Sequence, residues 1–218
     1  MKLHKFINII YMIKGSIYII SAPSGAGKSS IIRAFLSAKV LQNIKVSISY
    51  TTRMMRPGEQ HGKHYYFISK YKFLQMINND VFIEYASVFG NYYGTSKILV
   101  ESIIDDGIDL ILDIDWQGAQ QIKQKVSSVC TIFILPPTKN ELVRRLYCRG
   151  QDSYKKIKVR MKHAVAEIKH YLEYDYIIIN DDFNDALKNL ESIIRSKRLC
   201  LNHQIERYNK LINNLLLE

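Results

Sequence analysis

The sequence predicts an α/β protein in which helices flank a parallel β-sheet. Short apolar runs recur along the chain, segments with helical spacing of apolar residues separate them, and a glycine-rich turn follows the first run. Strands that alternate with helices form parallel sheets, and strands covered on both faces have nearly continuous apolar sequences. The chain has 218 residues, of which 47% are hydrophobic, so it can bury the core of a single domain.

Several apolar runs have the length of strands, and we expect each of them to be covered on both faces. They are residues 17–20, 110–114, 131–135 and 176–179. Helices are expected where apolar residues recur every three or four positions, because such residues share one helical face. Three groups of residues show this spacing and predict three helical segments. They are Leu142 and Leu146; Ile157, Met161, Ala164, Val165, Ile168 and Leu172; and Leu187, Leu190 and Ile194.

Two further patterns concern helix ends and the C-terminus. Residues 138–141, with the sequence Thr-Lys-Asn-Glu, fit a capping box that opens a helix. From residue 202 onward, Ile205, Tyr208, Ile212 and Leu215 share one face of another helix. We expect this face to pack on the body of the protein, with dimerisation through it as the alternative.

Two segments interrupt the alternation of strands and helices. Residues 49–98 contain short alternating runs rich in Tyr, Thr and Gly, which indicate a small inserted β-rich unit. Residues 141–166 are dense in Arg and Lys around Gly150, which indicates a basic helical flap. We therefore expect one domain with these two attached units and a core that comprises residues 15–48, 99–140 and 167–218.

Charge is the unusual bulk property, since 31 basic and 20 acidic residues give a formal net charge of +11. A nucleic-acid partner, a substrate with several phosphates, or a solvated lysine-rich face would each fit this value.

Cys130, Cys148 and Cys200 lie far apart, so we expect the reduced thiols of a cytoplasmic protein. The apolar run in residues 1–14 is too short for a membrane span. We therefore expect these residues to be an N-terminal extension, with either Met1 or Met12 as the translation start.

A glycine-rich turn connects the first predicted strand to a predicted helix. It reads Ser24-Gly25-Ala26-Gly27-Lys28-Ser29-Ser30, an arrangement that cradles phosphates through backbone N–H groups. Lys28 would reach the terminal phosphates of a nucleoside triphosphate, and the Ser29 hydroxyl would bind Mg²⁺. The usual pattern starts with glycine where this chain has Ala22, but Gly25 and Gly27 still flank the tight part of the turn. The alternative, a turn with a chance lysine, is disfavoured by the strand before it and the helix after it.

Asp113 ends the second apolar run, and Asp115 follows on the same face because strand side chains alternate. A carboxylate at the end of a strand beside the glycine-rich turn is expected to complete the Mg²⁺ shell, so Ser29 and Asp113 are the predicted metal ligands. An aspartate at a strand end can instead cap the next helix, and this is the alternative interpretation of Asp113.

Further motifs follow in a fixed order: Thr51-Thr52-Arg53-Met54-Met55-Arg56-Pro57-Gly58-Glu59, Phe89-Gly90-Asn91-Tyr92-Tyr93-Gly94-Thr95, Asp113-Ile114-Asp115-Trp116-Gln117-Gly118, Arg149-Gly150 and Asn180-Asp181-Asp182. With the glycine-rich turn, they make the chain resemble the bacterial guanylate kinases from about residue 15 to its end. The resemblance implies a P-loop nucleoside-monophosphate kinase fold, with residues 49–98 as the GMP-binding unit and 141–166 as a lid. It implies a cytoplasmic enzyme that catalyses ATP + GMP → ADP + GDP with Mg²⁺ as cofactor. Its partners would be ATP and GMP rather than a nucleic acid or a membrane, and monomer and homo-oligomer are left open.

The resemblance also implies which residues bind GMP. Arg53 and Arg56 would bind the phosphate through planar guanidinium donors, and tyrosine hydroxyls would add neutral donors. Glu84 matches the guanine reader, since one carboxylate can accept the adjacent N1–H and N2–H₂ donors of guanine, which adenine lacks. Without the resemblance, Glu84 would be interpreted as an exposed strand glutamate. The full set implied for GMP is Ser49, Arg53, Arg56, Tyr65, Glu84, Tyr93, Thr95, Asp113 and Asp115.

On the ATP side, the resemblance implies that arginines of the flap neutralise charge on the phosphoryl group during transfer. Together with Lys28, these are Arg145, Arg149 and Arg160. Arg149 and Asn180 are expected on opposite sides of the adenine, whereas Arg144 is expected to be a solvated surface residue. The set implied for ATP is Ser24, Gly25, Ala26, Gly27, Lys28, Ser29, Ser30, Arg149 and Asn180.

Two other function classes fit these residues less well. A catalytically inactive guanylate-kinase-like module that binds phosphopeptides would carry a damaged phosphate loop, whereas Gly27, Lys28 and Ser29 are intact here. A different P-loop nucleotide kinase, or a nucleic-acid-dependent ATPase, would not require a carboxylate at Glu84 together with the two arginines. Nucleic-acid binding is also disfavoured because the sequence has no evident basic stripe with interleaved aromatic residues.

Overall fold

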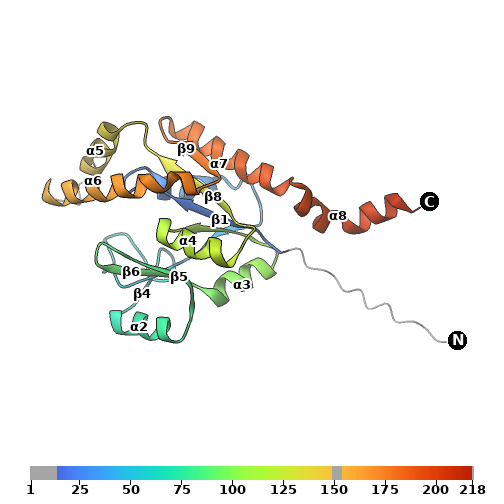
Figure 1. The fold of residues 1–218 in the computed structure, drawn as a ribbon, viewed down its shortest axis with the longest axis horizontal. Helices are drawn as coiled ribbons and strands as arrows, with labels where there is room; N and C mark the ends of the chain where they lie inside the picture. The colour runs from blue at the N-terminus through green and yellow to red at the C-terminus, as the bar shows by residue number, and fades with distance from the viewer. Residues whose placement is uncertain (1–13, 149–153, 218) are drawn as a thin grey trace.

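The computed structural model describes residues 14–148 and 154–217 of the chain. A five-stranded sheet with the strand order β2-β7-β1-β8-β9 forms the centre of this part (Figure 1). All of its neighbouring strands pair in parallel. The strands are β1 (Ile17–Ser21), β2 (Ile44–Val46), β7 (Asp109–Asp113), β8 (Cys130–Leu135) and β9 (Tyr176–Ile179). Parallel pairing requires each connection to cross a face of the sheet, and helices form these crossings.

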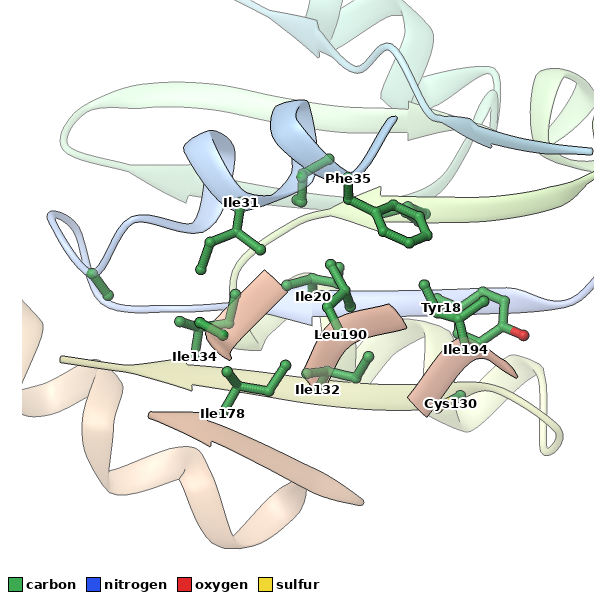
Figure 2. Packing of buried hydrophobic residues seen from close by; sticks show 14 residues of the cluster. Tyr18, Ile20, Ile31, Phe35, Cys130, Ile132, Ile134, Ile178, Leu190 and Ile194 are labelled. Atoms are coloured by element: carbon green, nitrogen blue, oxygen red, sulfur yellow. The ribbon is translucent and has the colours of Figure 1, made fainter. Parts of the chain in front are cut away.

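Helices α1 (Lys28–Ala38) and α7 (Phe183–Arg198) cover one face of the sheet. Their side chains meet those of β1 and β8 in a closely packed apolar cluster (Figure 2). Ile20 of β1, Ile31 of α1 and Leu190 of α7 are completely buried there. This cluster holds the start of α1, and therefore the glycine-rich turn before it, firmly against the sheet.

Helices α3 (Lys97–Asp105) and α4 (Trp116–Lys125) cover the other face. Leu110 and Leu112 of β7 pack there against Val100 of α3 and Ile122 of α4. Ile83, which belongs to the smaller sheet described next, joins the same cluster. The smaller sheet is thus attached to the core through α4 and this side chain.

A second sheet has the strand order β4-β3-β6-β5. Its strands are β3 (Tyr50–Thr51), β4 (Tyr66–Phe67), β5 (Phe82–Val88) and β6 (Asn91–Ser96), and α2 (Lys70–Asn78) packs on it. The buried ring of Phe73 in α2 stacks on Phe82 and Tyr92, with centroid distances of 4.6 and 5.4 Å. All of these elements lie within the segment that the sequence predicts as a β-rich insertion.

Helices α5 (Lys139–Cys148) and α6 (Tyr154–Ile168), followed by a short 3₁₀ helix η1 (Lys169–Glu173), lie above the carboxyl ends of the central strands (Figure 1). The Thr138 hydroxyl accepts a hydrogen bond from the Glu141 N–H at 3.0 Å, as the predicted capping box requires. The Glu141 carboxylate, however, binds Arg144 and Arg145. Only the threonine half of the capping box therefore forms as predicted.

The structure corrects one prediction about the core and adds one strand that was not predicted. β9 is the edge strand, and Tyr176, Ile177 and Ile179 are exposed, so this run is not covered on both faces. β2 has only three partly exposed residues and carries no apolar run that could have revealed it. The predicted parallel sheet flanked by helices is otherwise present.

The C-terminal helix α8 (Leu201–Leu216) extends away from the body (Figure 1). None of its residues is buried, and Ile205 and Leu215 of the predicted apolar face are 44% and 76% exposed. The expectation that this face packs on the body is therefore wrong. No helix in the described part of the chain is both long and apolar enough to cross a membrane.

Candidate active site

A cavity of about 560 Å³ lies at the carboxyl ends of β1 and β7, between the core, the smaller sheet, and helices α5 and α6. Its volume is in the range of pockets that hold small-molecule ligands. Parallel sheets bind ligands at this edge because the loops that follow neighbouring strands converge there. Residues of all three parts of the fold line the cavity, including Lys28, Glu84 and Arg160.

The glycine-rich turn has the backbone geometry of a phosphate cradle. Gly25 and Gly27 both have φ of 98°, a left-handed conformation that favours glycine. A Cβ at Gly27 would also lie 2.3 Å from Nδ2 of Asn180. Ala22 has no such requirement, since its φ is not in the left-handed region and its side chain packs against the apolar cluster beneath α1. The departure from the usual glycine pattern is therefore accommodated by packing.

Lys28 and Ser29 both contact the carboxylate of Asp113. The ammonium of Lys28 lies 2.7 Å from Oδ1 of Asp113 and donates to the Ile114 carbonyl at 2.8 Å. The Ser29 hydroxyl donates to Oδ2 of the same aspartate at 3.3 Å. A hydroxyl and a carboxylate at this separation, beside a phosphate-binding turn, are oxygen donors of the kind that Mg²⁺ prefers. Ser29 and Asp113, the predicted metal ligands, are thus adjacent.

Asp115 has the helix-capping role that the sequence suggested as the alternative for Asp113. Its carboxylate accepts from the Gly118 N–H at 3.1 Å and from the side-chain amide of Gln117 at 2.9 Å. It therefore caps the first turn of α4 while it also lines the cavity. Capping fixes the carboxylate in place and does not remove it from the site.

Glu84 of β5 is 3% exposed, although the sequence alone would suggest an exposed strand residue. Its Oε1 accepts a hydrogen bond from the Thr95 hydroxyl at 2.5 Å, and Thr95 is 3.3 Å from the Ser49 hydroxyl. Burial raises the pKa of the Glu84 carboxyl to about 7; the charge of Asp115 also raises this pKa, and the Thr95 hydrogen bond partly opposes both effects. The structure thus brings together three residues predicted to contact guanine.

Three of the four residues predicted to bind the GMP phosphate line the cavity. Arg56, Tyr65 and Tyr93 line it, and the two tyrosine rings are in edge contact at 5.9 Å. Burial raises the pKa of the Tyr65 hydroxyl, and the nearby charge of Asp113 adds to the effect. The Tyr65 hydroxyl is therefore a neutral donor at neutral pH.

Arg53 differs from Arg56 in that its side chain does not line the cavity in this conformation. Its guanidinium binds the Glu59 carboxylate at 2.7 Å and the Met54 carbonyl at 2.8 Å. Glu59 also accepts from the Arg56 N–H at 2.8 Å, so it joins the two arginine positions. Burial alone would raise the pKa of Glu59, but these hydrogen bonds and the arginine charges outweigh it and lower that pKa.

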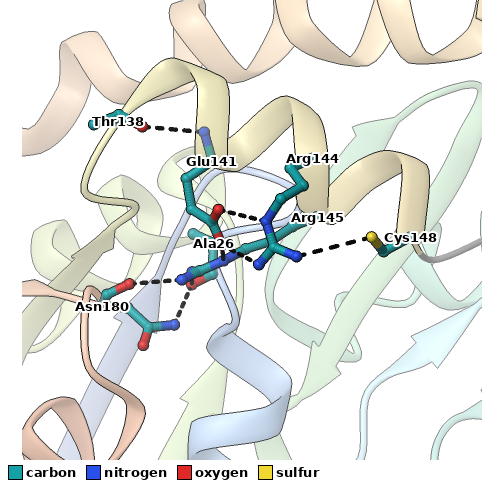
Figure 3. Close-up of polar contacts among 7 residues, drawn as sticks. All are labelled: Ala26, Thr138, Glu141, Arg144, Arg145, Cys148 and Asn180. Atoms are coloured by element: carbon teal, nitrogen blue, oxygen red, sulfur yellow. Dashed lines mark hydrogen bonds and ion pairs between the residues drawn. The ribbon is translucent and has the colours of Figure 1, made fainter.

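Arg145 connects α5 to the glycine-rich turn (Figure 3). Its guanidinium binds the Glu141 carboxylate at 2.7 Å, the Ala26 carbonyl at 3.3 Å and the Asn180 carbonyl at 3.0 Å. The Asn180 side chain is buried and donates to the same Ala26 carbonyl at 2.7 Å. In this conformation, Asn180 supports the turn from beneath and does not line the cavity.

Helix α6 reaches Ser24 with two side chains that are two helical turns apart. The guanidinium of Arg160 donates to the Ser24 hydroxyl at 3.0 Å, and Glu167 accepts from the Ser24 N–H at 3.2 Å. Burial raises the pKa of Glu167, which lines the cavity but was not predicted. Arg149, predicted to contact ATP, lies outside the described residues.

Comparison with known proteins identifies the relatives of this chain. A sequence model of the guanylate kinase family matches residues 14–197. This chain belongs to the guanylate kinase family. Guanylate kinase from Yersinia pestis is 57% identical over 205 residues, covering 94% of this chain and 99% of that protein. Guanylate kinase from Escherichia coli strain K12 is 56% identical with the same coverage.

The fold agrees with family membership. The crystal structure of guanylate kinase from Anaplasma phagocytophilum matches with a TM-score of 0.77 at 34% identity, over 94% of this chain and 98% of that chain. The predicted nucleoside-monophosphate kinase fold is therefore confirmed. Residues that sequence reasoning did not assign to the site are Glu59, which binds Arg53 and Arg56, and Glu167, which lines the cavity. Only Glu167 had a usable signal, because it shares a helical face with Arg160.

Proposed function

We propose that this guanylate kinase transfers the γ-phosphoryl group of ATP to GMP, giving ADP and GDP. The observation that carries the proposal is that one cavity contains both a phosphate-cradling turn with Lys28 and a buried carboxylate at Glu84. The turn suits the triphosphate, and the carboxylate suits the paired N–H donors of guanine. Family membership supports the same reaction.

The acceptor half of the proposal assigns GMP to the smaller sheet. Glu84, held by Thr95, would accept the N1–H and N2–H₂ groups of guanine, and Ser49 and Asp115 would lie beside the base. Arg56, Tyr65 and Tyr93 would bind the phosphate, and Arg53 would join them after it exchanges Glu59 for the phosphate. An adenine base would leave the Glu84 carboxylate without partners, which is the basis of selectivity.

The donor half assigns the triphosphate to the turn from Ser24 to Ser30. Lys28 would leave Asp113 for the phosphates, and Ser29 and Asp113 would then hold Mg²⁺, which supplies charge neutralisation when bound. Arg145 and Arg160 already contact the turn, so they are placed to neutralise charge on the phosphoryl group during transfer. We assign Arg149 and Asn180 to the adenine side on the family resemblance alone.

Transfer requires no covalent intermediate on the protein. An oxygen of the GMP phosphate would attack the γ-phosphorus in line while the two nucleotides are held together. We propose that residues 49–98 act as the GMP-binding unit and residues 141–166 as the lid, and that their closure excludes water from the phosphoryl group. We also propose a cytoplasmic enzyme, because its substrates are cytoplasmic metabolites, with no need for a nucleic acid or a membrane.

The test is a coupled assay of ADP formation with ATP as donor and GMP, dGMP or AMP as acceptor, with and without added RNA. We expect rapid turnover with GMP, slower or equal turnover with dGMP, and at least about 10³-fold lower kcat/KM with AMP. RNA should change none of these rates. ATP hydrolysis that depends on RNA, or equal use of AMP and GMP, would contradict the proposal.

A further inference from the structure

We propose that Gly118 and Gln121 of α4 are positioning residues for guanine selectivity: Gly118 provides the space for the Glu84 carboxylate, and Gln121 fixes the strand that carries it. The inference rests on the proposed function, in which Glu84 recognises guanine. Gly118 and Gln121 lie on a face of α4 that contacts neither the phosphate-binding turn nor the proposed site of the GMP phosphate.

The first observation is the space at Gly118. A Cβ at this position would lie 2.4 Å from Oε2 and 3.1 Å from Cδ of Glu84, and 3.3 Å from Cδ1 of Ile114. The backbone itself does not require glycine, because Gly118 lies inside α4 and its φ is not in the left-handed region. Alanine would be the better helix former at such a position. The neighbouring carboxylate is therefore the physical reason for glycine here.

Gly118 also contacts the second acidic residue proposed to lie beside the base. Its N–H donates to Oδ1 of Asp115 at 3.1 Å, which fixes that carboxylate at the start of α4. One residue thus lies between the carboxylates of Asp115 and Glu84. Its backbone holds the first of them, and its missing side chain leaves room for the second.

The second observation is the contact between α4 and the backbone of β5. The side-chain amide of Gln121 donates to the Tyr85 carbonyl at 2.7 Å and accepts from the Tyr85 N–H at 3.1 Å. Both backbone groups of the residue next to Glu84 are therefore satisfied by one side chain. Lys125, one turn further along α4, donates to the Ile83 carbonyl on the other side of Glu84.

These contacts occupy an edge of the smaller sheet. β5 is the last strand in the sheet order, and β6 pairs with its opposite edge. The Gln121 amide therefore substitutes for a neighbouring strand at Tyr85. Because α4 packs in the core through Ile122, the position of Glu84 is set by the core and not only by the smaller sheet. In this conformation, α4 thereby links the guanine-reading carboxylate to the core that carries the phosphate-binding turn.

A methyl group at Gly118 can be accommodated only if Glu84 moves. Oε2 is the end of a flexible side chain, so the fold can absorb Gly118→Ala by displacing the carboxylate from its 2.5 Å hydrogen bond with Thr95. A displaced carboxylate cannot accept both guanine donors in their proper geometry. We expect KM for GMP to rise by about 10- to 100-fold, the size of a lost charge-assisted hydrogen bond, and KM for ATP to change by less than about twofold.

The experiment compares Gly118→Ala and Gln121→Ala with Gln124→Ala, an exposed glutamine on the same helix, in the full chain. KM and kcat are measured for ATP, GMP and IMP, whose base lacks the N2 amino group, and melting temperatures are recorded. We expect Gly118→Ala to lower the preference for GMP over IMP without lowering the melting temperature. Gln121→Ala should raise KM for GMP by about 3- to 10-fold, and Gln124→Ala should match the wild type.

The outcomes separate this inference from the proposed function. A wild-type protein that does not phosphorylate GMP would overturn the proposed function itself. If the wild type is active but Gly118→Ala and Gln121→Ala keep its KM for GMP and its preference for GMP over IMP, the inference is wrong. If Gly118→Ala fails to fold, Gln121→Ala, which adds no volume, decides alone. In a Glu84→Gln background, Gly118→Ala should add little further loss, because coupled residues are not additive.

Discussion

Glu84 shows how a single residue can oppose folding while it serves binding. Its carboxyl is buried, with the Thr95 hydroxyl as donor, and burial raises its pKa from 4.5 to about 7. The folded state therefore holds the proton more tightly than the unfolded state. This contribution to stability is fully present below pH 4.5 and is lost as the pH rises to about 7. The loss corresponds to about 3 kcal/mol, which the binding of guanine can offset.

Glu84→Gln should separate these two effects. The amide of the variant does not titrate, so the variant should not lose this contribution to stability as the pH rises. Relative to the wild type, its free energy of unfolding should therefore increase by up to about 3 kcal/mol between pH 4.5 and 7.5. Urea unfolding at several pH values measures this difference. In kinetic assays the same variant should lose affinity for GMP more than for ATP. A stability difference independent of pH, or an equal loss for both nucleotides, would contradict the role given to this carboxylate.

Lys28 combines an observed structural contact with a proposed contact to the triphosphate. Its ammonium binds Asp113 and the Ile114 carbonyl, both at the end of β7. A triphosphate in the turn would offer it several negatively charged oxygens. Such a contact strengthens as charge moves during phosphoryl transfer, so it should affect turnover more than acceptor binding.

Lys28→Ala should lower kcat for GDP formation by at least about 10²- to 10³-fold and leave GMP binding nearly intact. Steady-state kinetics measure the first effect, and calorimetric titration with GMP measures the second. Lys45→Ala, at an exposed position of β2, is the matched control and should retain wild-type turnover. Turnover retained in Lys28→Ala would remove this lysine from the mechanism.

At the scale of elements, α5 carries two adjacent arginines that differ in their contacts with the core. Both bind Glu141, and together they lower its pKa to about 2. Only Arg145 continues to the Ala26 and Asn180 carbonyls, whereas the Arg144 side chain is mostly exposed (Figure 3). The helix register therefore places one cation at the phosphate-binding turn and its neighbour in solvent.

This difference predicts unequal effects of two similar substitutions. Arg145→Ala should lower kcat/KM for ATP by about 10²-fold, because it removes a cation from the turn and a contact that holds α5 there. Arg144→Ala removes a partner of the same glutamate and should change kcat/KM by less than about twofold. Steady-state kinetics with varied ATP test both. Equal losses would mean that the shared glutamate, and not the contact with the turn, controls activity.

At the scale of the whole molecule, stability and the site depend on the same two apolar clusters. One cluster holds α1 and α7 on the central sheet, and the other holds α3 and α4 with Ile83 of the smaller sheet. Helix α8 contributes little to either, since none of its residues is buried (Figure 1). Apolar residues of α7 and α8 should therefore differ greatly in their importance for folding.

Leu190→Ala in α7 should lower the free energy of unfolding by about 2–5 kcal/mol, because Leu190 is completely buried. Leu215→Ala in α8 should change it by less than about 0.5 kcal/mol, since that side chain is 76% exposed. Urea unfolding of both variants measures the difference at a fixed protein concentration. A loss for Leu215→Ala that grows as the protein concentration is raised would instead show that α8 is buried in an oligomer.

The amino-acid sequence by itself determined the elements whose signals are local. Apolar runs such as residues 131–135 predicted strands of the central sheet, because a parallel strand is covered on both faces. The sequence also predicted the phosphate-binding turn, because the local backbone conformation requires glycine at Gly25 and Gly27. The sequence did not reveal β2, because a short edge strand needs no apolar pattern. It also did not reveal that β9 is exposed, because the apolar run of β9 resembles that of a buried strand.

Only the tertiary structure decided which distant residues share an environment. Glu84 has the sequence surroundings of an exposed strand residue, yet Thr95, Asp115 and the space at Gly118 together make it a buried acid. Asn180 and Arg53 were predicted to contact nucleotides, and the fold holds them on Ala26 and Glu59. Burial and pKa depend on the packing of segments far apart in the chain, which no local pattern encodes.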